Sequence, residues 1–343
     1  MVDRLIEFAL RQRILVLVAT VLIVALGVLA FRALPIDAFP DVTNIQVQII
    51  TEAPGRSPVE VEQFITYPIE VQMTGLPRLA ELRSLSKFGL SMVTVVFEDQ
   101  VDIYFARQLV LERLIEARER LPADVEPALG PISTGLGEVY QYTLERPAGS
   151  DDPARPVEEN LMELRTIQDW IVRPILKTVP GVTDVNAFGG FVKQYQVVID
   201  PDRLKKYDLT LREVFEAVAQ NNTNTGGNVL EHASERYLVR GVGLIKDLQD
   251  IREIVVKAHD GVPIFVKDVA EITLGSEVRQ GALVKDGQGE AVAGIVMMIR
   301  GGSGKEVVAG VKQKVDEINR NQVLPGGVTA NAAGCFARGR RTE

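Results

Sequence analysis

The chain has 343 residues, 46% of them hydrophobic and 24% charged, with a formal net charge of −8. This composition is typical of folded protein rather than of a disordered chain, and the length allows two or three domains. A net acidic chain lacks the basic stripe that a nucleic-acid binder needs, so we expect no nucleic-acid partner. The single cysteine, Cys335, excludes an intrachain disulfide framework and a cysteine-rich zinc site.

An uncharged apolar run near the N-terminus extends from Ile14 to Phe31, with Thr20 as its polar interruption. As an α-helix this run is roughly 27 Å long, close to the hydrocarbon thickness of a bilayer. The alternative is a cleaved signal peptide, but its apolar region is usually about 7 to 15 residues long and ends at a cleavage site between small residues. Because Phe31 is followed by Arg32, the sequence predicts a retained transmembrane helix at 14–31.

Basic residues flank this predicted helix unequally, because Arg4, Arg11 and Arg13 precede it and only Arg32 follows closely. Basic residues beside a membrane span stay in the cytoplasm, so we expect a cytoplasmic N-terminus and export of everything after Arg32. We assign residues 1–13 to a short amphipathic helix on the cytoplasmic membrane surface. A simple extension of the span into the cytoplasm is the alternative.

The exported part is expected to begin with a strand and a helix. Apolar and polar residues alternate from 44 to 50, which predicts the strand. Ser57, Pro58 and Glu60 supply a capping residue, a proline at the first helical position and a glutamate placed to reach back, so the helix begins there. Its apolar stripe is expected to consist of Val61, Phe64, Ile65, Ile69 and Met73. These elements are followed by a hairpin at 79–86 and 90–97 and by a second helix at 101–121.

A comparable order of elements returns further along the chain. We expect strands at 139–144, 183–188 and 291–299 and helices at 157–179 and 303–320. Strand, helix, hairpin and helix are the beginning of a split β-α-β sandwich of the ferredoxin type. The sequence therefore predicts an α+β fold, with one N-terminal transmembrane helix and two related ferredoxin-like modules. An insertion from about residue 189 to 283 interrupts the second module.

The apolar run at 291–299 is too short to span a membrane as a helix and is predicted to be a buried central strand. Its neighbouring residues Met297 and Met298 face opposite sides of the strand, so they cannot hold one ion together. A charge introduced at Ile295 would be buried without a partner. The stretch 146–153 is rich in turn-forming and charged residues and is expected to be a mobile surface loop.

Few residues could perform catalysis or hold a metal. The two histidines, His232 and His259, lie far apart in the sequence. Glu231, His232 and Glu235 are interpreted as solvated residues of a loop rather than as a metal site. The glycine-rich stretch 300–306 lacks the first glycine and the hydroxyl residue of a phosphate-binding loop, and is interpreted as a turn that starts a helix. We therefore expect no enzyme, and we assign no catalytic, cofactor-binding or metal-binding residue.

Several stretches carry longer motifs. They are APGRSPVEVE at 53–62, YPIE at 67–70, GVTDVNAFGGFVKQY at 181–195, NNTNTGG at 221–227 and YLVRGVG at 237–243. In these motifs the chain resembles the heavy-metal branch of the resistance-nodulation-division permeases, and the resemblance extends from the N-terminus to about Val328. Such long motifs are specific to this branch.

The resemblance implies a homotrimeric, proton-driven inner-membrane pump that exports heavy-metal cations and is joined to a periplasmic adaptor and an outer-membrane channel. The resemblance to the family as a whole, and no individual residue, favours the cobalt-zinc-cadmium type over the copper-silver type. It also implies a domain plan. This plan has a first porter subdomain at 36–128, a second at 129–188 and 283–328, and a docking subdomain inserted at 189–282, whose loop at 221–227 would reach a neighbouring protomer.

The family continues beyond Val328 into a Phe-Tyr-Asp-Arg motif and a second membrane helix, which this sequence lacks. Residues 329–343 are rich in Ala, Gly and Arg and are interpreted as an aberrant tail of a truncated or frameshifted reading frame. The family's membrane carboxylates and metal-binding methionines lie beyond this point. The predicted span at 14–31 has no Asp, Glu, His or Lys, which excludes a proton relay within it. We therefore expect no transport by this chain alone, and the alternative is a membrane-anchored periplasmic scaffold that binds efflux-complex subunits.

Overall fold

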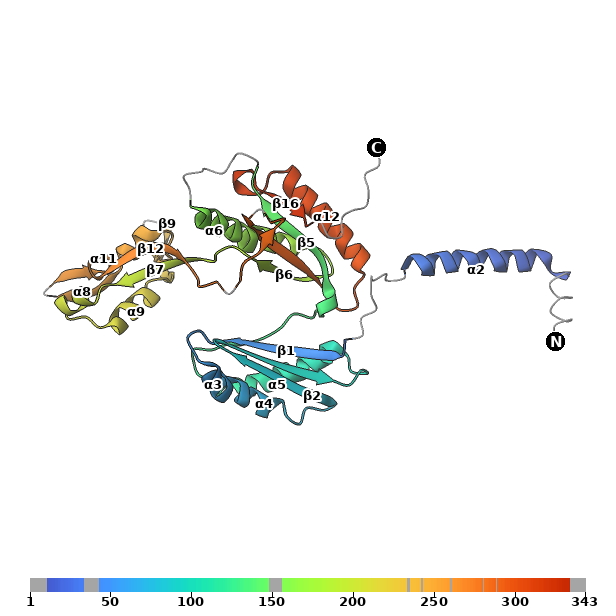
Figure 1. Cartoon of the computed structure of the whole chain (residues 1–343), viewed down its shortest axis with the longest axis horizontal. Coiled ribbons are helices and arrows are strands. Elements are labelled where there is room, and N and C mark those ends of the chain that lie inside the picture. Colours follow the sequence, from blue (N-terminus) through green and yellow to red (C-terminus); the bar gives the residue numbers. More distant parts are fainter. Residues whose placement is uncertain are drawn as a thin grey trace. The chain divides into compact units, whose positions relative to one another are not determined.

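A computed structural model describes residues 11–33, 43–147, 156–232, 235–241, 243–259, 261–279, 281–287 and 289–333 (Figure 1). The chain divides into two compact units. The first comprises Met1–Pro147, Asp169–Ala187 and Ala293–Glu343, and the second comprises Ala148–Gln168 and Phe188–Val292. Both units combine helices and sheets, so the predicted mixture of the two is confirmed.

The N-terminal apolar run folds as one helix, α2 (Arg13–Ala33). Its segment Arg13–Phe31 has a mean hydropathy of 3.1, and the rest of the chain buries none of it. The Thr20 hydroxyl donates to the Val16 carbonyl oxygen at 2.9 Å, so this polar side chain is satisfied within the helix. Among the described residues, α2 alone is long and apolar enough to cross a membrane, a criterion that a signal sequence also meets. Residues 1–10 of the predicted surface helix lie outside the described residues.

The first sheet has the spatial order β2-β3-β1-β4. Its strands are β1 (Ile45–Glu52), β2 (Leu79–Lys87), β3 (Leu90–Phe97) and β4 (Pro127–Leu129). β3 is antiparallel to both of its neighbours, with Ile49 of β1 opposite Val93 and Leu82 of β2 opposite Val95. The predicted hairpin is therefore confirmed, and its turn lies at Phe88-Gly89.

Three helices share a core with this sheet: α3 (Pro58–Val61), α4 (Tyr67–Met73) and α5 (Ile103–Arg118). The predicted capping box is confirmed, because the Ser57 side chain accepts from the Glu60 N–H and the Glu60 carboxylate accepts from the Ser57 N–H at 2.8 Å. Four residues of the predicted stripe are completely buried: Val61, Ile65, Ile69 and Met73. Phe64 was expected in the same stripe but is 53% exposed, because it lies at the edge of the arc that the buried residues define.

A π-helical turn precedes a proline at two places in the chain. The first turn is Glu62–Thr66, where the N–H of the following Tyr67 donates to the Glu62 carbonyl five residues back, and Pro68 comes next. The second turn is Gln168–Val172, and Pro174 follows. A proline has no N–H and its ring collides with the carbonyl four residues earlier, so the wider turn lets the helix continue past it. The helix predicted at 157–179 is therefore divided into α6 (Val157–Ile167), the π turn and α7 (Arg173–Leu176).

The second sheet has the spatial order β16-β5-β15-β6. Its strands are β5 (Glu138–Glu145), β6 (Val182–Phe188), β15 (Val292–Met298) and β16 (Thr329–Ala332). As in the first sheet, the third strand lies between the first and the second, and the fourth lies beside the first. The interior position predicted for the apolar strand β15 is confirmed. Helix α12 (Gly304–Arg320) contacts β5 and β16 and begins where the glycine-rich turn was predicted to start a helix.

Two expectations for this sheet differ from the structure. Residues 329–332, assigned to the tail, form the edge strand β16, in which Thr329 lies opposite Glu145 of β5. Asn319 of α12 holds this strand by donating to the Ala330 carbonyl at 2.8 Å and accepting from its N–H at 2.9 Å, bonds that no apolar period could indicate. Ile295 is only half-buried, whereas the next residue, Val296, is completely buried.

The chain between β6 and β15 forms a separate set of small elements. In chain order they are β7 (Lys193–Ile199), α8 (Pro201–Lys206), α9 (Leu211–Gln220), β8 (Thr225–His232), β9 (Glu235–Gly241), α10 (Leu248–Arg252), β10 (Val255–His259), β11 (Val262–Phe265), α11 (Val266–Val269), β12 (Ala270–Ser276), β13 (Val284–Lys285) and β14 (Gly289–Glu290). Two small cores stabilise them, one around Val266 and Ile272 and the other around Val214 and Val269. Most of the predicted loop at 146–153 lies outside the described residues.

Candidate functional site

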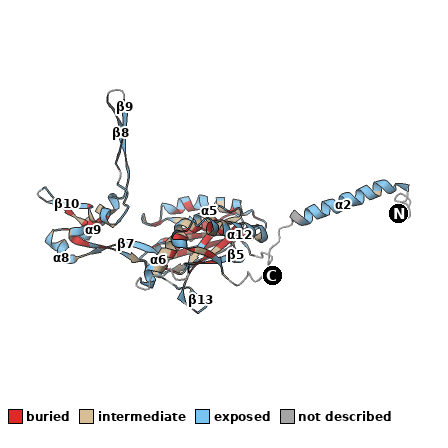
Figure 2. Cartoon of the chain, turned by 90° about the horizontal axis from the view of Figure 1, so that it is seen from above, coloured by how far each residue is buried: buried red, intermediate tan, exposed pale blue. Residues whose placement is uncertain are grey.

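Two of the sequence motifs, 221–227 and 237–243, meet in the hairpin formed by β8 and β9. The strands pair antiparallel, with Thr225 at the start of β8 opposite Gly241 at the end of β9. Figure 2 shows this hairpin extending away from α9 and β10 as a long arm. The loop expected at 221–227 is therefore a short turn that continues directly into a strand.

Asparagine side chains close the base of the hairpin. The Asn222 side-chain oxygen accepts from the Ile245 N–H at 3.1 Å, and that of Asn224 accepts from the Gly243 N–H at 3.2 Å. A side chain at Gly243 would begin 2.4 Å from the Thr223 carbonyl oxygen, so only glycine fits this close approach. Residues of the first motif thus bind the end of the second motif and the residues just after it.

The surface of the hairpin is suited to binding rather than to chemistry. Tyr237 is exposed, and its hydroxyl donates to the Glu235 carboxylate, which raises the pKa of Tyr237. In the sheet order of the described residues, β8 and β9 have no third strand. A two-stranded hairpin is marginally stable by itself, so it gains stability when a partner packs against it. The hairpin is therefore the best candidate for an interaction element in the described part of the chain.

The structure places both histidines at the ends of strands. Glu231 and His232 end β8 and Glu235 begins β9, with His232 opposite Glu235, so these residues lie on strand ends rather than in the predicted loop. His259 ends β10, opposite Val262 of β11. Within the described residues there is no cluster of three His, Cys, Asp or Glu that could bind a metal.

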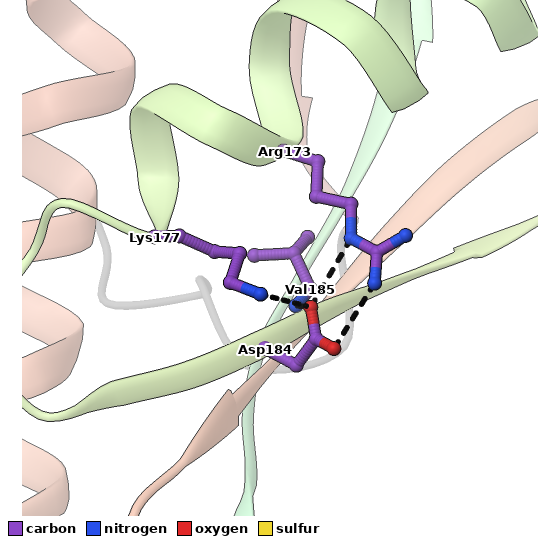
Figure 3. A network of polar contacts seen from close by, with 4 residues as sticks. All are labelled: Arg173, Lys177, Asp184 and Val185. Atoms are coloured by element: carbon purple, nitrogen blue, oxygen red, sulfur yellow. Dashed lines mark hydrogen bonds and ion pairs between the residues drawn. The ribbon is translucent and has the colours of Figure 1, made fainter. Parts of the chain in front are cut away.

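The motif at 181–195 contributes a polar cluster to the first unit (Figure 3). Arg173 of α7 donates to both oxygens of Asp184 on β6, at 3.1 and 3.0 Å, and Lys177 lies 3.3 Å from one of them. Burial raises the pKa of Asp184, but the Val185 N–H and the two cations outweigh it, so the pKa lies below its usual value. The negative charge of Asp184 is already compensated by two cations, which makes this carboxylate a poor metal ligand. The cluster instead fastens α7 to β6.

The end of the same motif is anchored within the second unit. Arg165 of α6 donates to the Gly189 carbonyl at 2.8 Å. The Arg279 guanidinium lies 4.5 Å from the centre of the Phe191 ring and forms a two-point ion pair with Glu290. Both arginines fix the chain where it enters or leaves the inserted segment. These roles could not be predicted from the sequence, because Arg165 and Gly189 are 24 residues apart and no local pattern links them.

Comparison with known proteins accounts for the motifs. The chain matches the model of the AcrB/AcrD/AcrF family over residues 5–334. It is 49% identical over 328 residues to the cobalt-zinc-cadmium resistance protein CzcA of Cupriavidus metallidurans, covering 96% of this chain and 30% of that protein. It is 40% identical over 329 residues to the cation efflux system protein CusA of Escherichia coli, with coverage of 96% and 30%.

A solved structure of a heavy metal efflux pump, crystal form II, superimposes with a TM-score of 0.83 at 35% identity. The superposition covers 96% of this chain and 32% of that one. The chain thus spans about 30% of the length of the curated relatives it matches. The matched family, the motifs and the superposition agree that the chain belongs to the AcrB/AcrD/AcrF family and, within it, to the heavy-metal efflux branch of the resistance-nodulation-division permeases, whose N-terminal third it represents.

Proposed function

We propose that this chain supplies the N-terminal part of a proton-driven pump that exports heavy-metal cations across the bacterial inner membrane. The observation that carries the proposal is its 49% identity, over 96% of its length, to a cobalt-zinc-cadmium resistance protein. Because the chain covers 30% of that protein, the transport activity is proposed for the whole pump. The protein is accordingly a transporter component and not an enzyme, with cation/proton antiport as its proposed mechanism.

The proposed domain plan follows the two sheets. The module around β1–β4 is the first ferredoxin-like porter subdomain, at 36–128. The module around β5, β6, β15 and β16 is the second, at 129–188 and from 283 onward, and we extend its end from 328 to 332 because β16 pairs with β5. The segment at 189–282 is the docking subdomain. Its separation into a different compact unit supports this assignment.

The proposed partners are two further copies of the same pump, a periplasmic adaptor and an outer-membrane channel. The exposed β8–β9 hairpin supports the first of these, because an arm with few contacts of its own is suited to reach a neighbouring protomer. We propose cobalt, zinc or cadmium as cargo rather than copper or silver. The 49% identity to a cobalt-zinc-cadmium resistance protein supports this choice.

A chimera tests the proposed function. Residues 1–332 of this chain replace the corresponding part of the Cupriavidus protein, and growth on zinc, cobalt and cadmium is measured in a strain that lacks its own exporter. We expect the chimera to restore growth at concentrations that arrest the strain with empty vector. The 343-residue chain alone should give no tolerance, because residues 14–31 of its span include no Asp, Glu, His or Lys that could serve a proton relay.

The control is the same chimera with a disrupted core residue, which should lose tolerance. A folded, membrane-inserted chimera that gives no tolerance would contradict the proposal. Tolerance conferred by the 343-residue chain in a strain with all other efflux subunits intact would favour the scaffold alternative instead.

The proposed topology has a cytoplasmic N-terminus and a periplasmic location for everything after α2. The bias of Arg4, Arg11 and Arg13 over Arg32 supports it. We expect alkaline phosphatase fused at Gly149 to be active and green fluorescent protein fused at the same position to be dark, since each reporter works on one side only. Inactive alkaline phosphatase with fluorescent green fluorescent protein would show that the orientation is the reverse of the proposed one. Alkaline phosphatase released into the soluble fraction would indicate a cleaved signal.

A further inference from the structure

Arg300, in the turn between β15 and α12, reaches the residues that precede β1. One of its guanidinium nitrogens donates to the Asn44 carbonyl at 2.9 Å, and the other terminal nitrogen donates to the Thr43 carbonyl. The main-chain N–H of Arg300 also donates to the Ile132 carbonyl at 3.2 Å. One residue, in the turn that follows the interior strand β15, thus binds both the segment that enters the first module and the linker between the two modules.

The linker that Arg300 contacts is itself fastened at both ends. At Gly130, the N–H donates to the Gln48 carbonyl of β1 at 2.7 Å, and the carbonyl accepts from Arg107 of α5 at 2.6 Å. At Ile132, the carbonyl accepts from the Thr183 hydroxyl of β6 at 3.4 Å in addition to Arg300. Only one residue separates these anchor points, and it is a proline, whose φ is fixed.

The backbone that carries Arg300 is also held in place. The N–H of the preceding Ile299 donates to the Gly181 carbonyl at 2.8 Å, so the turn is bonded to the start of β6. A planar guanidinium presents parallel donors in a rigid fork that fits two adjacent acceptors, which a lysine ammonium cannot reproduce. The geometry therefore requires arginine and not merely a positive charge.

We infer that Arg300 is a positioning residue that locks the two sheet modules and the chain entering β1 into one rigid body. The linker sets the spacing of the modules on one side, and the Arg300 fork closes the loop through Thr43 and Asn44. In a pump, this lock would transmit a displacement of the segment after α2 directly to β15. That reading rests on the proposed function, whereas the lock itself does not.

The test measures distances between the modules in the full chain, purified in detergent. Spin labels are attached at Glu112→Cys on α5 and Lys312→Cys on α12, both exposed, and Cys335→Ser removes the native thiol. Pulsed electron resonance then gives the distance distribution for the parent and for Arg300→Met, Arg300→Lys and Arg56→Met. Arg56→Met is the matched control, because it removes an arginine side chain whose bonds to Asp124 lie within the first module and do not involve the linker.

We expect a single narrow distribution in the parent and in Arg56→Met, and at least a doubling of its width in Arg300→Met. Arg300→Lys should remain broad, because one ammonium does not span both carbonyls. Amide exchange of a peptide covering 43–52 should accelerate in the two Arg300 variants only. Unchanged width in Arg300→Lys, or equal broadening in Arg56→Met, would overturn the inference. If Arg300→Met does not fold, Arg300→Lys decides alone. None of these measurements requires transport.

Discussion

Val296→Lys should unfold the module built on the second sheet. Val296 has 0% of its surface exposed and lies on the interior strand β15, so the substitution places an ammonium among apolar side chains without a carboxylate to pair with. Burial of a charge at a site built for an apolar side chain is among the few changes that cost more than about 4 kcal/mol, a large share of the stability of a domain. The expected result is loss of protease resistance of the exported part of the full chain in detergent, with a matching loss of the cooperative urea transition.

Two variants serve as controls for this prediction. Val278→Lys makes the same chemical change at a residue that is 91% exposed, and should leave stability within about 0.5 kcal/mol. Ile295→Lys, at the half-buried position next along β15, should fall between the two, because its ammonium can reach water along the flexible stem. Equal resistance of Val296→Lys and Val278→Lys would mean that β15 is not an interior strand.

Gly294→Ala should be the most costly single-methyl addition in the same strand. The new Cβ would lie 2.2 Å from the ring of Tyr142, which is completely buried on the neighbouring strand β5 and cannot swing away. Overpacking of this kind costs about 1–3 kcal/mol, and the rigid aromatic partner places this position at the upper end. The measurement is the midpoint of urea unfolding of the full chain, followed by circular dichroism.

A double-mutant cycle identifies the cause of that cost. Tyr142→Ala removes the ring and by itself should destabilise by about 3–5 kcal/mol through the cavity that it leaves. In that background, Gly294→Ala should cost almost nothing, because the colliding atoms are gone. An undiminished cost in the Tyr142→Ala background would show that backbone conformation at position 294, and not the ring, demands glycine.

The sequence predicted best the features that are set by neighbouring residues. The capping box of Ser57 and Glu60 and the hairpin turn at Phe88-Gly89 depend on residues a few positions apart, and both lie where the local pattern indicated. The interior position of the 291–299 run was predicted from its uninterrupted apolar character, since a strand covered on both faces has no polar side. These are short-range or compositional signals.

Features that depend on distant partners were missed or misread. Strand β16 has only four residues and no large apolar side chain, and it is held by Asn319 and by pairing with β5, so its residues were taken for a tail. The π turns were not expected, although Pro68 and Pro174 are visible in the sequence, because a proline predicts a break more often than a widened turn. Ile295 was misjudged because strand alternation alone does not show which face has the thinner cover.

The candidate interaction element was predictable in composition but not in geometry. The motifs at 221–227 and 237–243 were identified as stretches similar to a known family, yet nothing in either indicated that the two strands pair or that Asn222 and Asn224 close the base. Side-chain bonds to main-chain groups about 20 residues away leave no periodic trace. The same reason explains why the roles of Arg165, Arg279 and Arg300 emerged only from the folded chain.

The two modules share one strand order, and each has a π turn before a proline in the helix that follows its first strand. These shared features are those expected of a duplicated module. In the first copy the second and third strands are joined by the tight turn at Phe88-Gly89, and in the second copy the corresponding connection, from β6 to β15, holds the whole inserted segment. Loop tips tolerate such additions, because the entropy of closing a loop rises slowly with its length. Since β6 and β15 are neighbours, the segment enters and leaves across one strand spacing, about 4.8 Å. We therefore expect that another segment of any length can replace it without moving the ends of β6 and β15, provided that the bond between Arg165 and Gly189 is kept.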